Sequence, residues 1–451
     1  MASAAEQLAA NMNIEAFQKA TELHKRLIFT LVAMIVYRLG CYIPIPGIDI
    51  AAFSQAFEGQ AKGVLGMFNM FSGGAVQRMA VFSLNVMPYI SASIIVQLLG
   101  TVYPPWEKLR KEGGEAGRKT LNQYTRYLTV ALGIFQAFGI AIGLQAGQGI
   151  VSHPGMFFLV STTITLTGGT MFLTWLGEQI TSRGIGNGLS LIIFAGIVSV
   201  FPRYVMQAIS LVKTGALNSG GLLLLGVLAV GMIVAIVFFE RAQRRLFTQY
   251  PRRQQGSQMF GGDSSFLPLK VNSSGVMAPI FASSLLLLPG TAMGFLAAAN
   301  LPSWAGWIPG LVGKLQHGQP AFVALYAALI VFCCFFYTSV MFNPQEVAEN
   351  LRKFGGFLPG LRPGKNTAEY LDFVLTRVTV VGAAYITVVC VVPEIMIGAY
   401  NMPFYLGGTS ILIVVSVTMD TVTQVQAHLV THQYRGLMRK SSARSLARGR
   451  A

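Results

Sequence analysis

The side chains that could carry chemistry are scattered along this chain and form no catalytic set. The sequence shows no Ser/His/Asp arrangement, no paired carboxylates and no Cys-x-x-Cys spacing, and its five histidines form no ligand cluster. Gly360–Lys365 resembles a phosphate-binding loop, but Pro359 stands where that motif needs its first Gly and Asn366 where it needs Ser or Thr. We therefore predict that the chain is not an enzyme, uses no cofactor, and is driven by an external source of energy.

Polar residues inside apolar stretches are the more informative pattern. Asn, Ser, Gly and Pro open or interrupt the hydrophobic segments at 83–97, 183–191 and 261–280. A plain membrane anchor has no use for them, because irregular or polar backbone at membrane depth is tolerated only where it lines a cavity or packs on protein. The pattern predicts a membrane protein with an internal path, either a pore or a carrier.

Composition identifies the class of fold. Hydrophobic residues make up 53% of the 451 residues and charged residues only 11%, whereas a soluble globular chain carries roughly 25% charged residues. A spanning helix needs about 20 apolar residues, and about ten segments of that kind recur along the chain. We predict an all-α polytopic membrane protein with transmembrane helices near 27–45, 79–103, 127–147, 156–177, 188–211, 221–239, 275–298, 320–342, 378–398 and 405–427.

Basic residues are distributed unevenly over the connections between these segments. Most of the 33 Lys and Arg residues lie in both termini and in alternate connections, at 1–26, 106–126, 178–187, 240–271, 343–377 and 429–451. By the positive-inside rule, both termini are predicted to be cytoplasmic. The basic connections suit membrane lipids, including anionic lipids, or a docking surface for an anionic partner such as ribosomal RNA.

The predicted spans divide into two sets of five. We expect an interfacial amphipathic helix over 1–26, an N-terminal half over 27–211, a C-terminal half over 212–428, and a disordered basic tail over 429–451. An odd number of spans per half reverses the orientation of the second half, so an inverted pair with the path between its halves is expected. The segment 63–78 is apolar but too short to cross, which fits either a re-entrant lid or a buried connecting helix.

Few charges fall within the spans. Arg38 and Asp420 lie inside predicted spans, where a charge costs at least about 2.5–3.5 kcal/mol, so each is expected to face protein or water. Glu178 and Glu394 lie near span ends, where solvation is the simpler account. The alternative function, a secondary transporter of small solutes or ions, would need a denser set of intramembrane charges.

Several motifs in both halves of the chain resemble the SecY family, whose members are the central channel subunits of the bacterial Sec protein translocon. They are NVMPYISASIIVQLL (85–99), WLGEQITSRGIGNGLSLIIFAGI (175–197), LPLKVNSSGV (267–276), FNPQEVAENL (342–351), FLPGLRPGKNTAEYL (357–371) and PFYLGGTSILIVV (403–415). The resemblance runs from about residue 20 to 430. It implies a passive protein-conducting channel in the bacterial inner membrane, built as a clamshell of two five-helix halves.

The resemblance also implies a seal. A plug after the first span would correspond to about 63–78, including Phe71, Gly73, Gly74 and Arg78. A ring of apolar side chains would close the waist of the channel, at Val86, Ile90, Ile193, Ile280 and Ile413. Such a ring bonds poorly to water and ions and seals by dewetting. Taken singly, each of these residues is equally consistent with ordinary helix packing.

A lateral gate and a docking surface complete what the resemblance implies. Ser91, Gln97 and Ser283 would face the gate between spans 2 and 7, although simple helix packing would also explain them. Arg252, Arg253, Arg362 and Lys365 would bind the ribosome or the SecA motor ATPase. The implied partners also include the small subunits SecE and SecG, signal peptides and nascent chains.

Overall fold

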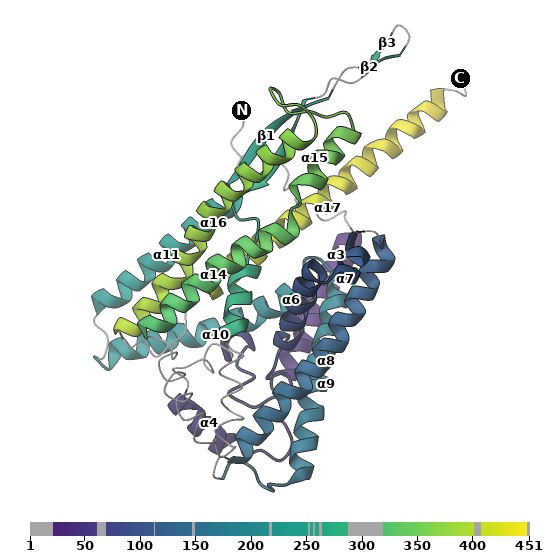
Figure 1. Cartoon of the computed structure of the whole chain (residues 1–451). Coiled ribbons are helices and arrows are strands. Elements are labelled where there is room, and N and C mark those ends of the chain that lie inside the picture. Colours follow the sequence, from purple (N-terminus) through teal and green to yellow (C-terminus); the bar gives the residue numbers. More distant parts are fainter. Residues whose placement is uncertain are drawn as a thin grey trace.

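A computed structural model gives the structure of this chain and describes residues 21–60, 69–111, 113–146, 149–215, 219–250, 253–255, 258–260, 264–286, 319–400 and 407–448. Helices dominate it, and they form two groups (Figure 1). Helices α3, α6, α7, α8 and α9 make one group, and α11, α14, α16 and α17 make the other. Helix α10 contacts members of both groups, namely α9, α17 and α11. The all-helical polytopic fold is thus confirmed.

The helices follow the apolar segments of the sequence. Their bounds are α3 Thr21–Gly40, α4 Ile50–Gln60, α6 Met87–Val102, α7 Pro104–Lys111, α8 Gly114–Ala146, α9 Met156–Arg183, α10 Gly188–Lys213, α11 Ser219–Arg241, α14 Pro320–Met341, α15 Pro344–Lys353, α16 Lys365–Tyr400 and α17 Gly408–Arg448. Six helices in the described part of the chain are long and apolar enough to cross a membrane, within α8, α9, α10, α14, α16 and α17. Shorter apolar helices occupy Met87–Thr101 and Met277–Leu286.

Several boundaries differ from the predicted ones. The span expected at 79–103 forms a helix only from Met87, because Met79 and Asn85 adopt positive φ and Pro88 stands in the first turn of the helix. The span expected at 275–298 is described only as far as residue 286. Helix α3 begins at Thr21, so residues 21–26 of the expected interfacial helix belong to it, and residues 1–20 lie outside the described part.

The ends of the second group hold two further differences. Helix α17 continues to Arg448, so the tail that was expected to be disordered is helical from 429 to 448. The stretch after Gly436 has no Pro and is rich in Ala, Arg and Leu, which favour helix. The basic connection at 240–271 contains strands β1 Gln243–Gln249, β2 Arg253–Gln255, β3 Gln258–Phe260 and β4 Ser264–Lys270.

These strands form two antiparallel pairs, and β1, β2 and β3 are seen beyond the ends of the helices in Figure 1. Strand β1 pairs with β4, with Gln243 opposite Lys270, and β2 pairs with β3, with Arg253 opposite Phe260. The largest apolar core lies below them and draws buried side chains from α3, α6, α9, α10, α11, α14, α16 and α17. Because this core includes both groups of helices, it holds the two groups together.

Candidate functional site

The five residues expected to form an apolar ring meet in this shared core. Ile90 lies on α6, Ile193 on α10 and Ile413 on α17, Ile280 lies on the helix Met277–Leu286, and Val86 immediately precedes α6. All five belong to one cluster of buried side chains, and none is more than 8% exposed. The fold therefore brings together residues that are more than 300 positions apart in the sequence. Their role as a ring remains a prediction.

The described part of the expected plug, residues 69–78, is a compact, turned segment inside the same core. Met70 and Phe71 are each 1% exposed and belong to the cluster that contains the ring residues. The turn closes through a bond from the Gly74 N–H to the Asn69 carbonyl (2.8 Å). It needs positive φ at Gly73 (67°) and Gly74 (82°), a conformation that glycine adopts without steric cost. Residues 63–68 lie outside the described part.

Contacts from both groups of helices hold the plug segment. The Asn85 Nδ2 donates to the Phe71 carbonyl oxygen (2.6 Å), and the Ser410 hydroxyl of α17 lies 3.4 Å from the Met70 sulfur. The Arg203 guanidinium of α10 donates to the side-chain oxygen of Gln77 (2.9 Å). The segment is therefore bound at the junction of the two groups of helices. Residues 69–71 are helical and residues 72–78 form turns, and the choice between a plug and a buried connecting helix stays a prediction.

The Arg38 side chain of α3 is bound by this segment and by α10. The Arg38 Nη1 donates to the Gly73 carbonyl (2.9 Å) and to the Ser199 hydroxyl of α10 (2.8 Å). Its Nη2 donates to the Tyr42 hydroxyl (3.2 Å). The expectation that Arg38 faces protein is confirmed. Asp420, by contrast, is exposed on α17, so the two charges do not converge on one site.

Two of the three expected gate residues are bonded within their own helix. The Ser283 hydroxyl donates to the Ile280 carbonyl of its own helix (2.9 Å), and the Gln97 amide donates to Ser93 of α6 (3.2 Å). Ser91 is buried. Among the described residues, a polar contact between these two helices joins the Ser284 hydroxyl to the Met87 sulfur (3.9 Å). The idea that serine and glutamine side chains bond across this seam gains no support from this arrangement.

The two long basic connections, 240–271 and 343–377, form one body. Their apolar side chains share a core that includes Leu246 and Leu269 of the β1–β4 pair and Leu358 and Leu371 of the later connection. A two-bond bridge joins their backbones, because the Gln249 and Phe357 N–H groups each donate to the other's carbonyl (2.9 and 3.0 Å). We call this body, residues 243–270 and 342–378, the basic platform.

The expected docking residues lie on the basic platform. Arg362 is exposed on the loop before α16, where its carbonyl accepts from the Thr367 hydroxyl (2.9 Å). Lys365 is exposed at the start of α16 and lies 3.9 Å from Glu369. Arg253 lies in β2, beyond the β1–β4 pair, and Arg252 lies outside the described residues.

A short connection, Val271–Val276, links the basic platform to the helix that carries Ile280. It is fixed to α11, since the Val271 N–H donates to the Ala242 carbonyl (3.0 Å) and the Asn272 amide to the Glu240 carboxylate (2.7 Å). The Ser274 hydroxyl donates to Asn272 (3.1 Å) and lies 3.7 Å from the Cys334 sulfur of α14. Sequence reasoning missed this network, because its members are spread over three elements.

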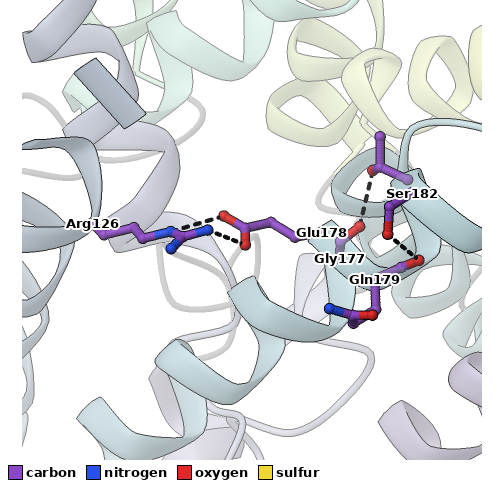
Figure 2. A network of polar contacts seen from close by, with 6 residues as sticks. Arg126, Gly177, Glu178, Gln179 and Ser182 are labelled. Atoms are coloured by element: carbon purple, nitrogen blue, oxygen red, sulfur yellow. Dashed lines mark hydrogen bonds and ion pairs between the residues drawn. The ribbon is translucent and has the colours of Figure 1, made fainter. Parts of the chain in front are cut away.

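Glu178 was expected to be solvated near the end of a span, but it binds an arginine. Its carboxylate accepts two bonds from the Arg126 guanidinium, one of them Nε to Oε1 at 3.1 Å, and so ties α9 to α8 (Figure 2). Figure 2 also shows the Ser182 hydroxyl donating to the Gln179 carbonyl on the same turn of α9. The pair is half exposed, so it contributes little to stability, about 0.2–1 kcal/mol. Glu394 is buried.

Comparisons with known proteins agree with this architecture. A family model described as SecY matches residues 80–422. A protein translocase subunit SecY from Vibrio cholerae is 50% identical over 430 residues, covering 95% of this chain and 96% of the relative. The corresponding subunit of Escherichia coli K12 is 49% identical with the same coverage. That of Rickettsia felis is 50% identical over 94% of this chain and 97% of the relative.

Solved structures show the same fold at lower sequence identity. A structure of a protein-conducting channel covers 91% of this chain and 93% of its own, with a TM-score of 0.67 and 16% identity. The Sec61 chain of a canine ribosome–channel complex covers the same shares, with a TM-score of 0.63 and 16% identity. The family model and the half-identical bacterial relatives together show that the chain belongs to the SecY family of protein translocase subunits.

Proposed function

We propose that this chain is a passive channel for polypeptides, closed at rest by an apolar waist and by the segment seated beside it. Secretory chains pass through the waist, and hydrophobic segments leave sideways into lipid between α6 and the helix Met277–Leu286. The chain carries out no catalysis of its own, so the energy comes from a ribosome or a motor ATPase. The channel lies in the bacterial inner membrane with both termini cytoplasmic.

One observation carries this proposal. Val86, Ile90, Ile193, Ile280 and Ile413 come from both groups of helices and lie in one cluster of buried apolar side chains with Met70 and Phe71 of the plug segment. A constriction of flexible aliphatic side chains excludes water and ions by dewetting, yet binds no particular sequence of the chain passing through it. A solute carrier would need convergent polar groups instead, and Arg38 and Asp420 do not converge.

The basic platform is the docking surface in this proposal. Arg362 and Lys365 are exposed on it, Arg253 lies in strand β2, and Arg252 is proposed to bind with them. Arginine suits both RNA phosphate and acidic protein surface, because its planar guanidinium forms paired bonds with either. The ribosome and the SecA motor would bind here, SecE and SecG would brace the helices, and anionic lipids would meet the remaining inner basic residues.

Transport in a reconstituted system tests the proposal. The chain, with its two small subunits, is placed in lipid vesicles and supplied with SecA, ATP and a secretory precursor. We expect the precursor to become protected from added protease, whereas no gradient-driven uptake of small solutes should occur. The variant Arg362→Glu should insert normally but lose most of this protection, while Arg118→Glu, which makes the same charge change on another exposed inner segment, should not. Solute uptake without precursor protection would overturn the channel assignment.

A further inference from the structure

We propose that Arg38 is the latch that keeps the plug segment seated, and is thus a positioning residue for the closed channel. The inference rests on the proposed role of residues 69–78 as the plug and assigns the force that holds them. It also gives a purpose to a charge that is unusual inside a membrane span.

The Arg38 guanidinium connects three elements: α3, the plug segment and α10. Arg38 belongs to α3, its Nη1 donates to the plug at the Gly73 carbonyl (2.9 Å), and the same nitrogen donates to Ser199 of α10 (2.8 Å). The Ser199 hydroxyl in turn donates to the Gly196 carbonyl of α10 (2.6 Å), which orients its oxygen lone pairs toward Arg38. The guanidinium therefore joins the plug to both walls of its seat.

The backbone of the seat is shaped for this contact. A Cβ on Gly73 would lie 2.7 Å from the Arg38 Nη1 and 3.0 Å from the Cα of Gly196. A Cβ on Gly196 would lie 2.5 Å from the Phe71 carbonyl oxygen. The plug and α10 thus approach at backbone distance at the point where Arg38 binds.

A second arginine extends the contact. Tyr42, one turn beyond Arg38, lies under the Arg78 guanidinium, whose Cζ is 4.1 Å from the centre of the Tyr42 ring. Arg38 reaches the same residue through its bond to the Tyr42 hydroxyl (3.2 Å). Tyr42 therefore orients Arg38 and also attracts the end of the plug segment by a cation–π contact.

The hydrogen bond from Arg38 to the plug can form only while the plug is seated. Among the salt bridges of the described residues none involves Arg38, and its plug acceptor is a backbone carbonyl that leaves when the plug leaves. Arg38 is partly buried, and a partly buried cation that loses an acceptor must be hydrated again. Arg38 therefore stabilises the closed state while the plug is seated. Once the plug leaves, water replaces the Gly73 carbonyl as its acceptor, and Arg38 no longer favours the closed state.

The test compares variants at position 38 by two independent readouts. Arg38→Met keeps the length and apolar character of the stem but removes every donor, whereas Arg38→Lys keeps the charge and can satisfy only some of the acceptors. The first readout is ion conductance of the reconstituted complex. The second is the rate at which a membrane-impermeant maleimide labels Ser72→Cys, which replaces a fully buried plug residue, in a chain whose four native cysteines are alanine.

We expect Arg38→Met to raise both conductance and labelling about tenfold, because a hydrogen bond to a charged group is lost. Arg38→Lys should lie between it and the wild type. The matched control is Arg126→Met, which removes an arginine bound to Glu178 between α8 and α9 and should change neither readout. Similar melting temperatures of the two methionine variants would separate latching from general stability.

The outcomes distinguish the latch from the plug itself. If Arg38→Met changes neither readout while deletion of residues 69–78 raises conductance, the latch is wrong and the plug assignment stands. If the deletion also leaves conductance unchanged, the plug assignment fails and the latch falls with it. Increased labelling in Arg38→Met that Arg38→Lys partly reverses supports the latch.

Discussion

Two kinds of residue contribute to the proposed seal. The ring residues are apolar, whereas residues around the plug segment form hydrogen bonds. The five ring residues offer only aliphatic surface, and all are buried. Asn85 does the opposite: it adopts positive φ (49°) and donates to the Phe71 carbonyl. Asparagine accepts that conformation more readily than most residues. The proposed seal therefore combines an apolar waist with a plug segment that polar bonds fix in place.

A polar substitution in the ring should open this seal. Ile193→Asn should raise ion leak through the resting channel and allow export of precursors with defective signal sequences, because an amide at the waist holds water. The measurement combines conductance with export of a signal-sequence mutant. Ile192→Asn is the matched control, since Ile192 is equally buried on the same helix and outside the ring. Equal leak in the two variants would show that position 193 has no special role.

At the scale of elements, the sequence predicted the helices better than their contacts. Apolar segments of about 20 residues located the spans, and Pro88 with positive-φ Asn85 shortened one of them. The packing of 240–271 against 343–377 could not be predicted. Isolated apolar residues within basic loops give no periodic signal. Arg38 was recognisable as unusual, but its acceptor is a carbonyl of a turn, which no pattern of side chains reveals.

The shared core of the basic platform should control docking without affecting the seal. Leu371 is fully buried there, and replacing a buried leucine by alanine costs about 2–5 kcal/mol of stability. We expect Leu371→Ala to weaken ribosome binding and to speed proteolysis of both basic connections. Resting conductance should stay unchanged, because the ring lies in a different cluster. Glu369→Ala, at an exposed position on the same helix, is the control. Unchanged binding and proteolysis in Leu371→Ala would contradict the joint platform.

In the described part of the chain, two groups of helices meet at one buried apolar core, with the basic platform at one end. A single short connection, Val271–Val276, runs from that platform to the helix that carries Ile280, and Glu240 holds it to α11. The proposed docking surface is thus joined to the helix of Ile280 by one short connection. The family resemblance predicted the ring, plug and platform residues, whereas hydropathy alone predicted only a membrane protein with an internal path.

The most direct test of the account places a polypeptide in the waist. A photoreactive residue is introduced at Ile193, and the channel is given a secretory chain that is stalled on a ribosome or driven by SecA. The account predicts a crosslink to the mature part of that chain, and a much weaker one from Val198 of the same helix, which is 42% exposed. If the protein is folded with its small subunits bound and only Val198 crosslinks, polypeptides do not pass between these helices, and the central claim is wrong.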